Sequence, residues 1–160
     1  MRIDHELGEK ELPNVYNTAA VARKLAEALV ETYQLVLESQ LCRWNVTGSL
    51  FYSVRRMTEV HVTDMFAAVD AMAERIRTLD HPAHIGSAAL FGQMVGSQHT
   101  EVTAIEMVES LVFSHNRLAA RLRALVETAE CAGDPVTADL AAARGAFHER
   151  AAWMLGATAK

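Results

Sequence analysis

Apolar side chains recur through most of the chain at alternating steps of three and four residues, with polar side chains between them. Two stretches are the most regular, and they contain Met65, Val69, Met72, Ile76 and Leu79, and then Val108, Leu111, His115, Leu118, Leu122 and Leu125. This spacing puts one side chain per turn on the same side of an α-helix. The pattern therefore predicts long amphipathic helices that pack against one another.

The first helix is expected from about Thr18 to Arg43, before Thr47-Gly48, with Leu25, Leu29 and Val36 buried. The second is expected from about Ser49 to Leu79 and would extend roughly 45 Å at 1.5 Å per residue. The third is expected from about Glu101 to Cys131, and Gly133 stops it.

A fourth helix is expected to begin at Asp134-Pro135. Asp accepts hydrogen bonds from free N–H groups, and Pro is tolerated at the first helical position. The residues expected on its buried side are Leu140, Phe147 and Met154.

The segment 80–100 has a different composition, with Pro82, Gly86, Gly92 and Gly96 around a short apolar patch at 88–91. This predicts a crossover that carries at most a short helix. Four helices with a single long crossover have ferritin-like connectivity. We therefore expect an all-α, ferritin-like four-helix bundle, with one domain over residues 1–160 and an N-terminal tail at 1–14.

Composition agrees with this fold. The 160 residues are 51% hydrophobic and include only 3 Pro and 8 Gly, which suits one helical core. No apolar run approaches the roughly 18 residues of a membrane span, so we expect a soluble, cytoplasmic protein. Cys42 and Cys131 fit no metal or disulfide pattern and are expected to be small, partly buried hydrophobes.

The net charge of −5 argues against a general attraction to nucleic acid. The N-terminal tail sets two basic residues against four acidic ones, and after Leu155 the C-terminus offers only Lys160. DNA binding through the tails is therefore not expected, and association with the nucleoid is left open.

Two motifs identify a family. They are Trp44-Asn45-Val46-Thr47-Gly48-x-x-Phe51 followed by Asp70-x-x-x-Glu74-Arg75, and the C-terminal run 129–140 followed by His148-Glu149-x-x-x-Trp153-Met154-Leu155. Together they resemble the Dps family of mini-ferritins. The resemblance implies a hollow shell of twelve four-helix subunits that stores iron and protects against oxidative and starvation stress. It also implies that Fe(II) is oxidised to Fe(III) at ferroxidase centres between two-fold-related subunits.

The chain departs from that family at the iron ligands. Arg43 and Arg55 stand where typical members have His ligands, whereas the acidic positions Glu59, Asp70 and Glu74 are retained. A guanidinium has no lone pair to donate to a metal. We therefore expect the five residues to form a cross-subunit ion-pair cluster at a degenerate centre.

Three alternatives remain open. The carboxylates could still hold one iron that is oxidised with peroxide, although His61 would point about 200° away from Glu59. The shell could coat DNA or act structurally without redox chemistry, or it could mix with an intact paralogue. An ordinary ferritin centre within one subunit is not expected, because no Glu-x-x-His motif occurs.

Other candidates have simpler roles. Trp44 is expected to anchor the interface, and His115 to be a hydrogen-bonded core histidine. Asp134 and Asp139 match acids of the family's iron pore, although Ala143 replaces a further acid beside Arg144. A metal site from His81, His84 and His99 rests only on proximity in sequence.

Overall fold

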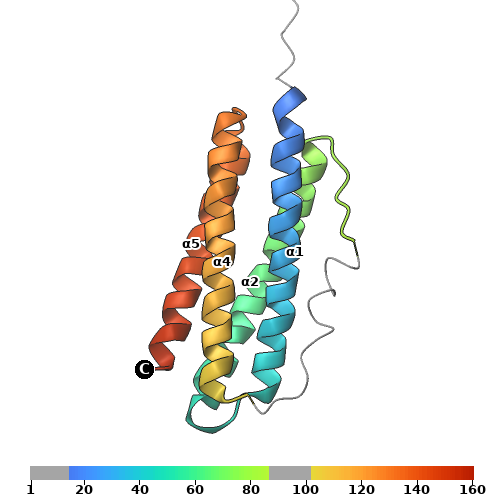
Figure 1. Ribbon diagram of the computed structural model, residues 1–160. Helices are drawn as coiled ribbons and strands as arrows, with labels where there is room; N and C mark the ends of the chain where they lie inside the picture. Colours follow the sequence, from blue (N-terminus) through green and yellow to red (C-terminus); the bar gives the residue numbers. More distant parts are fainter. Residues whose placement is uncertain (1–14, 87–101) are drawn as a thin grey trace, which may run out of the picture.

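Four long helices run side by side in the computed structural model, which describes residues 15–86 and 102–160 (Figure 1). They are α1 (Val15–Asn45), α2 (Phe51–Thr78), α4 (Ala104–Cys131) and α5 (Pro135–Thr158), and a 3-10 helix, η1 (Gly48–Leu50), joins α1 to α2. No strand occurs within these ranges. The predicted all-α four-helix bundle is confirmed. None of these helices is long and apolar enough to cross a membrane.

The helices are arranged as two antiparallel hairpins. The largest contacts join α1 to α2 and α4 to α5, α1 also packs on α4, and the contact between α2 and α5 is smaller. Helices α2 and α4 point the same way, so the chain between them has to return along the length of the bundle (Figure 1). This topology is consistent with the predicted long crossover, most of which lies outside the described residues. The short helix expected at 88–91 lies outside the described residues.

Glycine conformations and side-chain hydrogen bonds explain where the helices begin and end. Gly48 has φ of 74° and Gly133 has φ of 68°, a left-handed conformation that glycine adopts without steric cost. The side chain of Thr103 accepts a hydrogen bond from the Glu106 N–H, and Glu106 accepts one from the Thr103 N–H. This capping box starts α4 slightly later than the predicted Glu101. At the start of α5, Asp134 accepts from the Thr137 N–H at 2.9 Å, as predicted.

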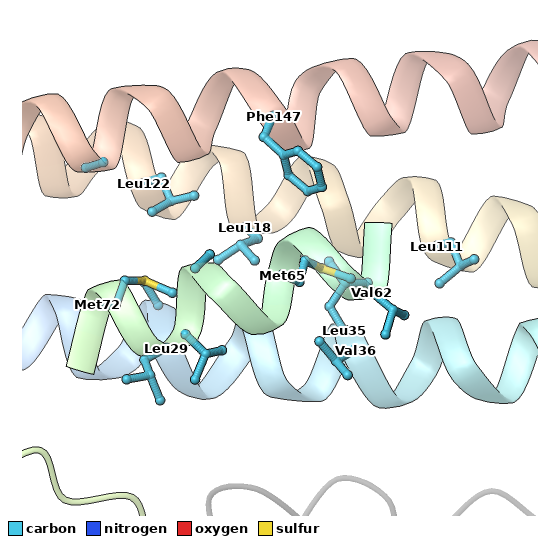
Figure 2. Close-up of a cluster of buried hydrophobic side chains, with 14 of the residues drawn as sticks. Leu29, Leu35, Val36, Val62, Met65, Met72, Leu111, Leu118, Leu122 and Phe147 are labelled. Atoms are coloured by element: carbon cyan, nitrogen blue, oxygen red, sulfur yellow. The ribbon is translucent and has the colours of Figure 1, made fainter. Parts of the chain in front are cut away.

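The core lies along the centre of the bundle, where side chains from all four helices meet (Figure 2). Nearly all residues of the predicted stripes on α1, α2 and α4 are buried there, and Leu79 is half-buried. Burying a side chain of leucine size contributes about 1.5–3 kcal/mol, so these stripes supply most of the driving force for packing.

The predicted buried side of α5 is only partly confirmed. Phe147 is buried in the core, as predicted, and Leu140 is half-buried, whereas Met154 is 36% exposed. Apart from Phe147 and Leu155, the buried side is made of small residues and one histidine, namely Thr137, Ala138, Ala141, Gly145, His148, Ala151 and Ala152. Small residues such as Gly145, which faces Leu122, let α5 approach α4 closely.

The two cysteines differ in exposure. Cys42 is buried in the core, as expected, whereas Cys131 is exposed because it is the last residue of α4.

Candidate functional site

Four charged residues form a stripe on one side of α2. At about 100° per residue, Arg55, Glu59, Asp70 and Glu74 fall within roughly 100° around the helix axis. Glu59 is half-exposed and the other three are exposed. We call these four residues the α2 stripe.

Glu59 is held by arginines at the end of the stripe nearest η1. One carboxylate oxygen lies 4.0 Å from Nη2 of Arg43 on α1, and the other lies 2.7 Å from Nη1 of Arg56. Arg55 instead lies over the ring of Phe51, with its guanidinium carbon 5.9 Å from the ring centroid. Arg56 was not predicted from the sequence as a partner of Glu59, although their i,i+3 spacing is that of a helical ion pair.

The other end of the stripe carries two carboxylates that pair with no other described residue. Asp70 and Glu74 are exposed and form no hydrogen bond or ion pair with the rest of the described chain. Eleven residues separate Asp70 from Glu59, which corresponds to about 16 Å along the helix. One subunit therefore brings Arg43 and Glu59 together but does not bring them to Asp70 and Glu74.

Aromatic side chains surround the Arg43 end of the stripe. Trp44 is 61% exposed and Tyr52 is 75% exposed, and Phe51 is 45% exposed. Phe66 lies between the two halves of the stripe and is 44% exposed. Exposed apolar surface of this kind is typical of protein–protein contacts.

Three histidines lie inside the bundle, away from the stripe. His61 of α2, His115 of α4 and His148 of α5 are 5%, 0% and 1% exposed. The Nδ1 atoms of His115 and His148 are 2.9 Å apart, a hydrogen bond that confirms the predicted core role of His115. His61 points away from Glu59, as helical spacing predicts.

Burial keeps these imidazoles neutral. Burial, together with the charge of a neighbouring histidine, lowers the pKa of His115 to about 3 and that of His148 to about 2. Burial also lowers the pKa of His61, although Asp64 opposes this effect. At neutral pH each of the three rings is therefore uncharged and has one nitrogen that carries a lone pair.

Asp134 has a structural partner. Its carboxylate accepts a hydrogen bond from Arg75 Nη2 at 2.7 Å, while Arg75 Nε donates to the hydroxyl of Thr137 at 2.9 Å. Burial alone would raise the pKa of Asp134, but the bonds from Thr137 and the charge of Arg75 lower it overall. Asp139 is exposed.

The crossover histidines are not gathered into a site. The ring of His81 is bonded to the hydroxyl of Thr18 at 3.2 Å, His84 is exposed, and His99 lies outside the described residues. Across residues 15–86 and 102–160, no group of three or more His, Cys, Asp or Glu side chains is placed to hold one metal ion.

Comparison with known proteins identifies the family. Residues 22–160 match the Ferritin family model, described as a ferritin-like domain. The chain is 32% identical over 117 residues to a DNA protection during starvation protein of Porphyromonas gingivalis, an alignment that covers 72% of this chain and 74% of the relative. The chain belongs to the Dps family of ferritin-like proteins.

Other similar proteins agree with this assignment. The crystal structure of a Dps protein from Bacillus brevis superposes with a TM-score of 0.81 at 26% identity, covering 91% of this chain and 98% of that one. The chain is also 34% identical over 140 residues to a low temperature-induced protein of Nostoc sp., covering 84% of this chain and 77% of the relative. The Dps bundle is thus shared along nearly the whole chain.

Proposed function

We propose that the protein is a subunit of a twelve-subunit Dps-type shell that sequesters iron and protects the cell against oxidative and starvation stress. We further propose that its intersubunit ferroxidase centre is degenerate. The observation that carries both statements is the α2 stripe, whose two halves lie too far apart to act within one subunit but are spaced to meet across a two-fold axis.

The four residues of the α2 stripe are placed symmetrically about one point along the helix. The midpoint between Glu59 and Asp70 along α2 is also the midpoint between Arg55 and Glu74, and it falls between residues 64 and 65. If two copies of α2 pack antiparallel about a two-fold axis at this point, Glu59 faces Asp70 of the partner subunit. Arg55 then faces Glu74 of the partner subunit. Two-fold packing is the commonest arrangement in closed oligomers.

The exposed aromatic residues support the same arrangement. Phe66 lies beside the proposed axis, and Trp44, Phe51 and Tyr52 lie beside the arginines. Packing them against a second copy would bury apolar surface that one subunit leaves in water. Asp70 and Glu74 would find cationic partners there that they lack within the subunit.

The charges of this site disfavour iron. Each centre would contain Arg43, Arg55 and three carboxylates, so the guanidiniums would offset much of the negative charge that attracts Fe(II). Arg43 already lies 4.0 Å from Glu59 within the subunit. Paired guanidinium and carboxylate groups can hold an interface in register, although desolvation limits their net contribution to stability.

Residual ferroxidase activity is the second candidate. Asp70 and Glu74 are four residues apart on one side of α2 and carry no other bond in the described chain, so they could converge on one Fe(II). In that case peroxide would oxidise the bound ion, and Asp70→Ala would abolish the reaction while leaving the shell intact.

The experiment measures Fe(II) binding and peroxide-driven oxidation by the metal-free assembly, with the number of subunits determined by light scattering on the same sample. We expect a twelve-subunit shell that oxidises Fe(II) no faster than buffer does. Saturable, stoichiometric oxidation that Asp70→Ala removes would establish the second candidate instead. A monomer or dimer would overturn the proposed shell.

A further inference from the structure

The three buried histidines come from three different helices and gather in one place. The ring centroids of His61 and His115 are 5.6 Å apart, and those of His115 and His148 are 5.1 Å apart. Phe147 packs against all three rings at centroid distances of 5.0 to 6.4 Å. Histidine is a costly way to fill an apolar interior, because each ring brings two nitrogen atoms that need partners.

Two of these nitrogens have no partner. Nδ1 of His61 and Nε2 of His115 are buried and accept or donate no hydrogen bond within the described chain. Buried side-chain nitrogens are satisfied in the large majority of cases, so an unpaired one needs a physical explanation. Here two unpaired nitrogens belong to neighbouring rings, and a shared ion would satisfy both.

We propose that His61, His115 and His148 form a site for a divalent transition-metal ion inside each subunit. Nδ1 of His61 and Nε2 of His115 bind the ion. His148 does not bind it but acts as a positioning residue. This site is separate from the α2 stripe, lies within one subunit, and uses none of the carboxylates of the proposed ferroxidase centre.

The bond between His115 and His148 is compatible with the tautomer of His115 that a metal requires. When Nδ1–H of His115 donates to Nδ1 of His148 at 2.9 Å, Nε2 of His115 carries the lone pair that a metal needs. Metal-binding histidines generally donate their second N–H to such an acceptor, which orients the ring and makes the ligand more basic. His148 supplies that acceptor from the neighbouring helix.

A cavity reaches His61, one of the two proposed ligands. A space of about 390 Å³ lies between α2 and α5, and its lining includes His61, Phe147 and the carboxylate-bearing Asp64. Asp64 pairs with Arg144 at 2.6 Å, which balances the charge of that guanidinium near the rings. Water from this cavity would complete the coordination shell, since two protein ligands leave positions open.

The donor atoms select the metal. Imidazole nitrogen suits Zn²⁺, Cu²⁺, Ni²⁺ and Fe²⁺, whereas Mg²⁺ and Ca²⁺ prefer oxygen. Only two histidines bind the ion directly, and the third acts through a hydrogen bond. No preformed group of three ligands is therefore required, and none occurs in the described ranges.

The test is to measure zinc binding to the metal-stripped assembly by calorimetry. We expect one Zn²⁺ per subunit that is lost in His61→Gln and in His115→Gln. His148→Gln should keep the site but weaken its affinity about 10- to 100-fold, the usual effect of removing such a hydrogen bond. His84→Gln changes an exposed histidine and should bind as the unaltered protein does. Asp70→Asn removes a carboxylate of the α2 stripe. Zinc that this variant no longer binds is zinc held by the stripe, and zinc that it still binds is held inside the bundle.

X-ray absorption on the unaltered zinc-loaded protein provides a readout that does not depend on variants folding. We expect two imidazole nitrogens per bound zinc. An oxygen-only shell would overturn the proposal, and so would zinc binding that survives both His61→Gln and His115→Gln. An equal loss in His84→Gln would also overturn it.

Discussion

Arg75 near the end of α2 and Asp134 at the start of α5 form an ion pair of 2.7 Å that joins two helices with little other contact. The same carboxylate caps α5 through the N–H of Thr137. One side chain therefore holds both the beginning of a helix and its position against a neighbour.

Asp134→Ala should lower the free energy of unfolding by about 1–3 kcal/mol, because it removes a helix cap and a half-buried charged hydrogen bond. Urea unfolding of the assembly measures the change. Asp139→Ala, which alters an exposed acid of the same helix, should change it by less than about 0.5 kcal/mol. Equal effects of the two substitutions would show that Asp134 contributes nothing beyond surface charge.

The same residue makes stability depend on pH. Because the pKa of Asp134 is lowered in the folded state, its contribution is complete above the unfolded value of 3.8. It is lost as the pH falls from there through the lowered pKa. Asp134→Ala should therefore be less stable than the unaltered protein at neutral pH, and the gap should narrow in acid. A gap that stays constant on acidification would contradict this assignment.

Restoring both histidines of the family pattern should restore iron binding. Arg43→His together with Arg55→His removes two positive charges and adds two nitrogen donors beside the retained carboxylates. We expect saturable Fe(II) binding by calorimetry where the unaltered shell shows little. Arg23→His, on the exposed part of α1, is the matched control. No gain in a correctly assembled double variant would mean that the carboxylates do not converge as proposed.

The proposed two-fold packing can be tested by charge reversal. Arg55→Glu should weaken the assembly, since it would place a second carboxylate against Glu74 of the partner subunit. Glu74→Arg alone should also weaken it, because two guanidiniums would then face each other. The variant with both changes should regain much of the lost assembly, which sedimentation velocity can follow. If the two effects simply add, Arg55 and Glu74 do not face each other.

The two thiols should differ in reactivity. Burial, together with the charge of Glu38, raises the pKa of Cys42 to about 11, so little thiolate forms at neutral pH. Cys131 is exposed. A thiol reagent followed by peptide mass spectrometry should label Cys131 first, and Cys42 only after unfolding. Rapid labelling of Cys42 in the folded protein would contradict its buried position.

How well the buried side of each helix could be predicted from the sequence depended on which side chains form it. On α4 the buried positions are large aliphatic residues at regular spacing, so the stripe from Val108 to Leu125 was predicted residue by residue. On α5 most buried positions hold small residues, four of them alanine, which is equally common on exposed surfaces. The hydrophobic pattern therefore predicted a buried position for the large residue Met154 and not for Ala151 and Ala152.

The histidine cluster was only partly predictable. His115 stands within an apolar stripe, which indicated a core position, but nothing in the sequence linked it to His148 or His61. These residues are 33 and 54 positions away and on other helices. The α2 stripe was easier to find, because its residues share one helix and a fixed periodicity relates them.

The pairing of α1 with α2 and of α4 with α5 has a consequence for how the chain folds. Each hairpin is built from residues close in sequence, so its contacts form with little loss of chain entropy. The contacts of α1 with α4 require the whole crossover to close and should form later. We expect each hairpin to acquire structure as a separate unit, with docking of the two halves as the slower step.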